Sequence, residues 1–221
     1  MISKKTRVKI CCISSAEEAK MAINAGASLL GLVSEMPSGP GIIDETLITE
    51  IAETVPPGIG TVVLTSKIKA DEIIEQQKKC KVNTIQLVDV LPDGEHEKLK
   101  SALPGISIIQ VIHVRDESSI DECIKLSQFI DAFLLDSGNP DLEVKVLGGT
   151  GKTHNWEISK KIVKAVEVPV FLAGGLRPDN VQDAIRKVRP YGVDLCSGIR
   201  TDGNLDFEKL SQFMINVENV I

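Results

Sequence analysis

The sequence contains no apolar stretch that approaches the roughly 20 residues needed to cross a membrane. Its amino terminus begins with basic side chains, but the apolar run that follows is far too short for the core of a signal peptide. Basic residues form no dense run anywhere, and the net charge is −6 with a pI near 5.2. These absences argue against a membrane protein and against nucleic acid or an anionic membrane as the main partner.

Cysteine and histidine are also too few and too scattered for a disulfide framework or a zinc site. The five cysteines are an odd number without framework spacing, and the three histidines are dispersed at positions 96, 113 and 154. Thiols in this pattern are typical of a reducing compartment. We therefore expect a cytoplasmic protein without a structural metal ion.

What the chain does contain is a regular alternation of two patterns. Short apolar runs rich in β-branched residues alternate eight times with amphipathic segments of helical period. The predicted strands are residues 8–13, 29–34, 61–66, 84–89, 107–114, 132–137, 170–175 and 192–198. Continuous apolar strands separated by helices predict a parallel sheet covered by helices. Eight such units in 221 residues fit one α/β domain over residues 1–221, a single (β/α)8 TIM barrel, since such barrels typically have ~250 residues.

A carboxylate stands at the end of the sixth predicted strand. Asp136 closes the run AFLLD, and the segment after it contains the glycine-rich sequence GGTGKT before the next predicted helix. That sequence is not a nucleotide-binding P-loop, because Val146 occupies the position where the motif requires its first glycine. Barrels present catalytic groups at the carboxyl ends of their strands, so Asp136 is a candidate catalytic acid.

The first strand supplies a candidate partner for this acid. Because side chains alternate along a strand, Lys9 and Cys11 should share one face, and Ile10 and Cys12 the other. If Cys11 points into the barrel mouth, Lys9 lies one layer beneath it and Cys12 packs under the helices. Cys11 would then face Asp136 across the rim.

Seven segments, in this order, resemble the phosphoribosylanthranilate isomerase family, the barrel enzymes of tryptophan biosynthesis. The segments are VKICCIS, AGASLLGLV, IQL, LLDS, GGTGKTHNW, LAGGLRPDNVQDAI and VDLCSGI. The resemblance covers nearly the whole chain and implies a cytoplasmic isomerase of aromatic amino acid biosynthesis. It implies Cys11 as the general base and Asp136 as the general acid of an Amadori rearrangement. It also implies phosphate binding by the loops after the last three strands, at Gly149, Gly174, Gly175, Ser197 and Gly198.

The expected chemistry needs one proton donor and one acceptor, so no cofactor and no metal ion are expected. The expected partner is a small phosphorylated sugar, bound by a monomer or a homodimer. Two other functions stay open from the sequence: a divergent barrel that acts on another sugar phosphate, and a non-catalytic barrel that binds a phosphorylated metabolite. A binding module has no need of a retained acid and base, which favours the isomerase.

The family pattern is altered at the end of the site expected to bind the aromatic ring. Pro40 stands where the family carries an arginine that binds the anthranilate carboxylate. Cys12 replaces the glycine that follows the catalytic cysteine, Val88 replaces a histidine, and Arg200 replaces an acid. Arg115 or Arg200 is therefore expected to replace the missing cation, or else the substrate differs.

Overall fold

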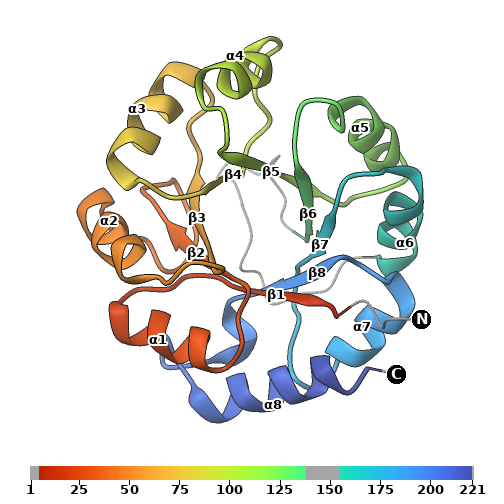
Figure 1. The fold of residues 1–221 in the computed structure, drawn as a ribbon. Coiled ribbons are helices and arrows are strands. Elements are labelled where there is room, and N and C mark those ends of the chain that lie inside the picture. Colours follow the sequence, from red (N-terminus) through yellow and green to blue (C-terminus); the bar gives the residue numbers. More distant parts are fainter. Residues whose placement is uncertain (1–4, 138–154, 221) are drawn as a thin grey trace.

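The computed structural model describes residues 5–137 and 155–220, and these form a closed barrel of eight parallel strands surrounded by helices (Figure 1). The strands are β1 Arg7–Ile10, β2 Leu29–Val33, β3 Gly60–Thr65, β4 Thr84–Leu87, β5 Ser107–His113, β6 Ala132–Asp136, β7 Val170–Leu172 and β8 Gly192–Leu195. The helices are α1 Ala16–Asn24, α2 Glu45–Thr54, α3 Ala70–Cys80, α4 Glu95–Ala102, α5 Ser118–Leu126, α6 Trp156–Ala165, α7 Val181–Val188 and α8 Phe207–Glu218. The predicted (β/α)8 TIM barrel is confirmed.

The strands are apolar on both faces because they separate two apolar layers. In β6, Ala132 and Leu134 point into the barrel, whereas Phe133 and Leu135 pack against the helices. Asp136 follows this alternation, and its side chain lines the pocket at the mouth of the barrel. Parallel pairing of β1 with β8 closes the ring and brings the first and the last strand of the barrel together.

The helices begin close to the positions that their capping residues predict. The side-chain oxygens of Ser15, Asp44 and Asp206 accept hydrogen bonds from backbone N–H groups in the first turns of α1, α2 and α8. Helix α7 is an exception, because Asn180, which precedes its first residue Val181, makes no capping hydrogen bond with its side chain. Pro178 lies in the turn before this helix, where its ring restricts the backbone.

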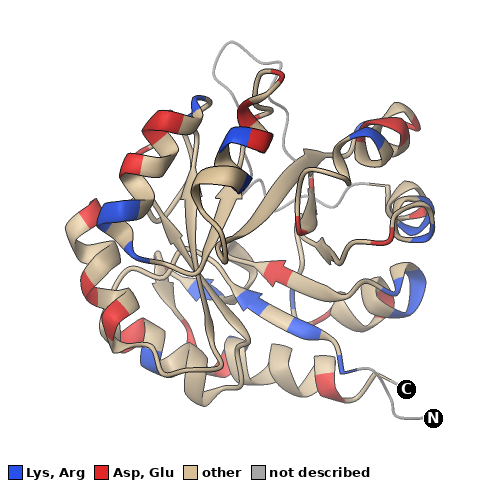
Figure 2. Ribbon diagram, turned by 45° about the horizontal axis from the view of Figure 1, so that its top comes forward, with Lys and Arg blue, Asp and Glu red and all other residues tan. Residues whose placement is uncertain are grey.

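The charged residues lie mainly on the outer helices, where acidic and basic positions are interspersed along the ribbon (Figure 2). Among the described residues, no helix is long and apolar enough to cross a membrane. A short 3-10 helix, Ser197–Ile199, and the two-residue strands β9 Arg200–Thr201 and β10 Asn204–Leu205 connect β8 to α8. This connection completes the rim of the barrel on the side of β1.

Candidate active site

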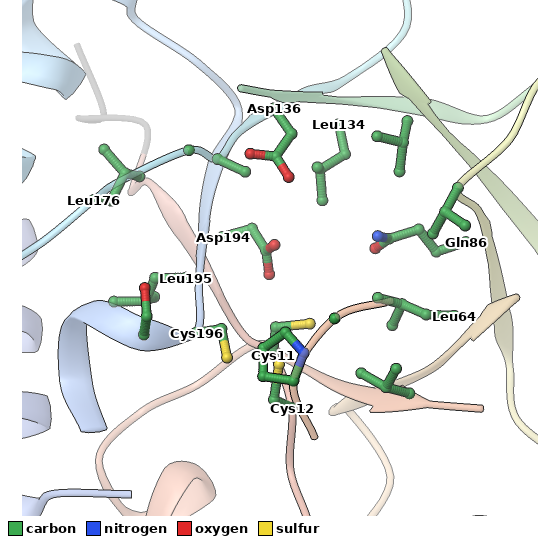
Figure 3. A pocket seen from close by; sticks show the side chains of 18 of the residues that line it. Cys11, Cys12, Leu64, Gln86, Leu134, Asp136, Leu176, Asp194, Leu195 and Cys196 are labelled. Atoms are coloured by element: carbon green, nitrogen blue, oxygen red, sulfur yellow. The ribbon is translucent and has the colours of Figure 1, made fainter. Parts of the chain in front are cut away.

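A pocket opens at the carboxyl ends of the strands (Figure 3). Several of its lining residues end or directly follow strands, as Cys11 does after β1, Asp136 in β6 and Cys196 after β8. Concave sites of this kind, lined mainly by apolar side chains with a few polar groups, are typical of small-molecule binding. The predicted pair Cys11 and Asp136 thus lies in one pocket.

Beneath the pocket, Lys9 is fully buried and pairs with a carboxylate on the neighbouring strand β8. Lys9 Nζ lies 2.8 Å from Asp194 Oδ1. Burial by itself would lower the pKa of Lys9, but the charge of Asp194 and the Cys11 thiol raise it above its ordinary value. Lys9 is therefore a fixed positive charge inside the barrel.

Gly31 of β2 leaves the space in which this charge meets the Cys11 thiol. A Cβ atom at Gly31 would lie 2.9 Å from Cys11 Sγ and 3.0 Å from Lys9 Nζ. Both groups therefore lie beside the same glycine, and Lys9 is beneath Cys11 as strand alternation predicts. A hydrogen bond from Cys12, together with the charge of Lys9, lowers the pKa of the Cys11 thiol against the opposing effect of burial.

Cys12 does not pack under the helices, and that expectation is wrong. Its backbone has φ 62°, in the left-handed region that non-glycine residues seldom adopt. The strand ends at Ile10, so the alternation stops and Cys12 turns into the pocket beside Cys11. Hydrogen bonds with Cys11 and Cys196 raise the pKa of the Cys12 thiol, which makes Cys12 a proton donor to its neighbours.

Asp136 lies on the opposite side of the pocket from Cys11 (Figure 3). Burial raises the pKa of its carboxyl to about 6, and the charge of Asp194 acts in the same direction. The backbone N–H of Ser137 donates a 2.7 Å hydrogen bond to Asp136 Oδ1 and partly opposes the shift. At neutral pH a fraction of Asp136 consequently carries a proton that it can donate.

Two turns beside this pair contain glycines, which leave the backbone without obstructing side chains. Gly174 and Gly175 follow β7 with φ 81° and 63°, which only glycine adopts readily, and both line the pocket together with Ser197. A Cβ at Gly198 would lie 2.1 Å from the carbonyl oxygen of Leu176, so the turns after β7 and β8 are in direct contact. Gly149 lies outside the described residues.

The two arginines expected near the aromatic end do not line the pocket. Arg200 is held by Glu18, with Arg200 Nη1 at 2.8 Å from Glu18 Oε1, and also donates to the backbone oxygen of Cys12. Arg115 is exposed after β5. Pro40 does line the pocket, and the described lining residues include no lysine or arginine. No group of three or more potential metal ligands occurs among the described residues.

Sequence reasoning missed two polar residues of the pocket, Asp194 and Gln86. Each stands inside an otherwise apolar strand, and each is at least nine-tenths buried. The same signal identified Asp136, and it was available at both positions. The sequence does not show what such a residue contacts. Asp194, for example, pairs with Lys9, which lies 185 residues away in the chain.

The chain is similar to known proteins over nearly its full length. Residues 8–216 match the family described as N-(5'-phosphoribosyl)anthranilate (PRA) isomerase. A curated relative, N-(5'-phosphoribosyl)anthranilate isomerase 2 of Methanosarcina mazei, is 38% identical over 215 residues, covering 96% of this chain and 94% of that protein.

Two solved structures resemble the barrel. Phosphoribosyl anthranilate isomerase from Thermotoga maritima has a TM-score of 0.83 and 28% identity, with 96% of this chain and 98% of that chain covered. A phosphoribosyl anthranilate isomerase in complex with reduced 1-(o-carboxyphenylamino)-1-deoxyribulose 5-phosphate has a TM-score of 0.80 and 25% identity, with the same coverage. With its fold, its full-length match and its curated relatives in agreement, the chain belongs to the N-(5'-phosphoribosyl)anthranilate isomerase family.

Proposed function

We propose that this protein converts N-(5'-phosphoribosyl)anthranilate to 1-(o-carboxyphenylamino)-1-deoxyribulose 5-phosphate, the isomerisation of tryptophan biosynthesis. One observation carries the proposal. Across a single pocket, Cys11 has a lowered pKa and Asp136 has a raised one. A thiol made more acidic and a carboxyl made less acidic are the base and the acid that an Amadori rearrangement requires.

Asp136 acts first, as the general acid. Its proton passes to the ring oxygen of the ribose while the bond between that oxygen and C1 breaks. The lone pair of the substituent nitrogen forms the second C1–N bond, which gives an open-chain iminium ion. A pKa of about 6 leaves roughly one carboxyl in ten protonated at pH 7, while keeping the proton acidic enough to be donated.

Cys11 then acts as the general base. Its thiolate removes the proton from C2, the electrons of that C–H bond form the C1–C2 double bond, and the π electrons of the C1–N double bond return to nitrogen. The resulting enolamine becomes the ketone when the proton of its C2 hydroxyl is lost and C1 gains one. Lys9 stabilises the thiolate by its charge, and Asp194 holds Lys9 in place at 2.8 Å.

The substrate phosphate is proposed to bind at the two turns after β7 and β8. Backbone N–H groups around Gly174, Gly175, Ser197 and Gly198 provide neutral donors, and the amino end of α7 follows the first turn. Under this proposal the phosphate lies on the side of the pocket where Leu176 and Cys196 stand, and the sugar lies between Cys11 and Asp136, whose positions Figure 3 shows.

The test is turnover of phosphoribosylanthranilate, followed by the loss of its fluorescence. Cys11→Ser and Asp136→Asn should each abolish turnover. Cys123→Ala is the matched control, since Cys123 is buried in α5 away from the pocket, and its variant should keep the activity of the folded protein. Near-full activity in either Cys11→Ser or Asp136→Asn would overturn the assignment.

A second candidate is the isomerisation of another phosphorylated aminosugar. It is favoured by Pro40 and by the absence of lysine and arginine from the described lining of the pocket. Under this alternative, phosphoribosylanthranilate should compete with other aldose phosphates no better than inorganic phosphate does.

A further inference from the structure

Gln86 of β4 carries an acceptor that the described part of the protein leaves unused. Its side chain is 3% exposed and lines the pocket, yet Gln86 Oε1 is buried without a hydrogen-bond partner among the described residues. Buried polar atoms are almost always paired, and an unpaired one calls for a reason. A ligand that fills the pocket supplies such a reason.

Gln110, on the adjacent strand β5, shows how a buried glutamine of this barrel is otherwise accommodated. It is fully buried and faces the helices, where its amide contacts His96 Nε2 at 3.0 Å and the backbone oxygens of Leu87 and Asp89. Gln86 differs in facing the pocket, beside Leu64 of β3, with which it is paired in register. Among the described residues, the unpaired buried glutamine oxygens belong to Gln76 and Gln77 of α3 and to Gln86, and of these only Gln86 lines the pocket at the mouth of the barrel.

The position of Gln86 indicates which substrate atom it meets. In Figure 3 its amide points into the pocket from the side opposite Leu176 and Cys196, which mark the two phosphate turns. A phosphoribosyl amine carries its phosphate on C5 and its nitrogen on C1, at the other end of the sugar. With the phosphate at the turns and C2 at Cys11, the C1 nitrogen lies toward Gln86.

We propose that Gln86 Oε1 accepts a hydrogen bond from the N–H group on C1 of the substrate and stabilises the iminium ion. The proposal rests on the function proposed above. The N–H group persists in substrate, iminium ion, enolamine and product, but nitrogen carries a full positive charge only in the iminium ion. A carbonyl acceptor therefore binds that intermediate more strongly than the ground state, and the difference accelerates the reaction.

Gln86→Met tests the proposal, because methionine keeps the length of the side chain and removes the amide. We expect kcat to fall about 10- to 100-fold, as for a lost hydrogen bond to a charged group, with a much smaller change in KM. Thermal stability of the ligand-free protein should stay equal or rise, because an unpaired buried acceptor is removed. Inorganic phosphate should bind the variant as it binds the unaltered protein.

Gln110→Met is the matched control, since it removes a fully bonded amide from the same depth of the adjacent strand. It should lower the melting temperature and leave kcat within about twofold in the folded protein. If Gln86→Met keeps kcat, or if it loses stability as Gln110→Met does, the proposal is wrong even though the unaltered enzyme turns over phosphoribosylanthranilate. If the unaltered enzyme has no such activity, the proposed function fails first.

Discussion

At the scale of single residues, burial destabilises the charged form of Asp136 more than the neighbouring hydrogen-bond donors and charges stabilise it, so the ionised carboxyl lowers the stability of the fold. The folded protein holds the proton of Asp136 up to a pH of about 6, whereas the unfolded chain releases it near 3.8. The neutral group therefore favours folding below the unfolded pKa, and this advantage is lost as the pH rises through the folded pKa.

Asp136→Asn should accordingly stabilise the protein at high pH while it abolishes turnover. The amide is neutral at every pH, so the variant should be more stable than the unaltered protein by about 2–3 kcal/mol at pH 8, with the difference disappearing near pH 4. Urea unfolding at the two pH values measures this. Asp93→Asn, which changes an exposed carboxyl in a turn, is the control for the substitution itself. Equal stability of Asp136→Asn and the unaltered protein at pH 8 would contradict the raised pKa.

Pro40 gives a second prediction at the scale of single residues, and it concerns specificity for the substrate. Pro40→Arg adds a guanidinium to a pocket whose described lining contains no cation. A charge-assisted hydrogen bond to the anthranilate carboxylate contributes on the order of 1.5–3 kcal/mol, so KM for phosphoribosylanthranilate should fall roughly ten-fold or more. The change in kcat should be smaller, because the carboxylate is bound in the ground and transition states alike. Pro40→Ala, which removes the ring without adding charge, should leave KM unlowered. A KM that is the same in all three proteins would show that the carboxylate does not lie near Pro40.

At the scale of elements, strand β2 leaves space for two side chains of the first strand and its end, Lys9 and Cys11. The space exists because Gly31 of β2 has no side chain. Gly31→Ala should displace both Cys11 Sγ and Lys9 Nζ, which its Cβ would approach to 2.9 and 3.0 Å. We expect kcat to fall by more than ten-fold, because the thiolate and its compensating charge separate, with a stability cost of about 1–3 kcal/mol. Gly60→Ala in β3 is the control, since its Cβ would meet only the Leu29 side chain at 3.0 Å. Equal activity losses in the two variants would mean that the effect is general to the barrel.

The elements themselves were largely predictable from the sequence, for a physical reason. A parallel strand covered by helices is buried on both faces, so it appears as a continuous apolar run such as AFLLD or TVVLT. Predicted strand ends were less accurate where the chain turns sharply. Nothing local in KICCI indicates the left-handed backbone at Cys12, and the signal was the glycine that the family carries at this position, since glycine adopts such a backbone readily.

At the scale of the whole molecule, the site depends on contacts that no local pattern records. Lys9 and Asp194 come from the first and last strands, and they meet only because β1 pairs with β8. The position of Asp136 at the mouth of the barrel was predictable, because it is fixed by the end of its own strand, β6. The alternation of side chains along the first strand predicted that the charge of Lys9 lies beneath Cys11. It could not predict that the carboxylate of Asp194 holds Lys9, because the two residues meet only in the closed ring. Local sequence thus predicts which side chains reach the mouth, and closure determines which of them pair.

Closure of the ring also predicts how a bound anion should act on the whole fold. The turns proposed to bind phosphate follow β7 and β8, and β8 pairs with β1, so an anion bound there would connect the last strands of the barrel to each other. A ligand that binds only the folded state adds RT ln(1 + [L]/Kd) to its stability, about 2.7 kcal/mol at a hundred times Kd. Inorganic phosphate should therefore raise the melting temperature by about 5–10 °C at such a concentration, since 1 kcal/mol corresponds to roughly 2–4 °C in a domain of this size. Sodium chloride of equal ionic strength should produce no comparable rise.

In Gly198→Ala the added Cβ would approach the Leu176 carbonyl oxygen to 2.1 Å and push the two turns apart, so phosphate should no longer raise that variant's own melting temperature. A phosphate effect of the same size in Gly198→Ala would place the anion elsewhere on the molecule.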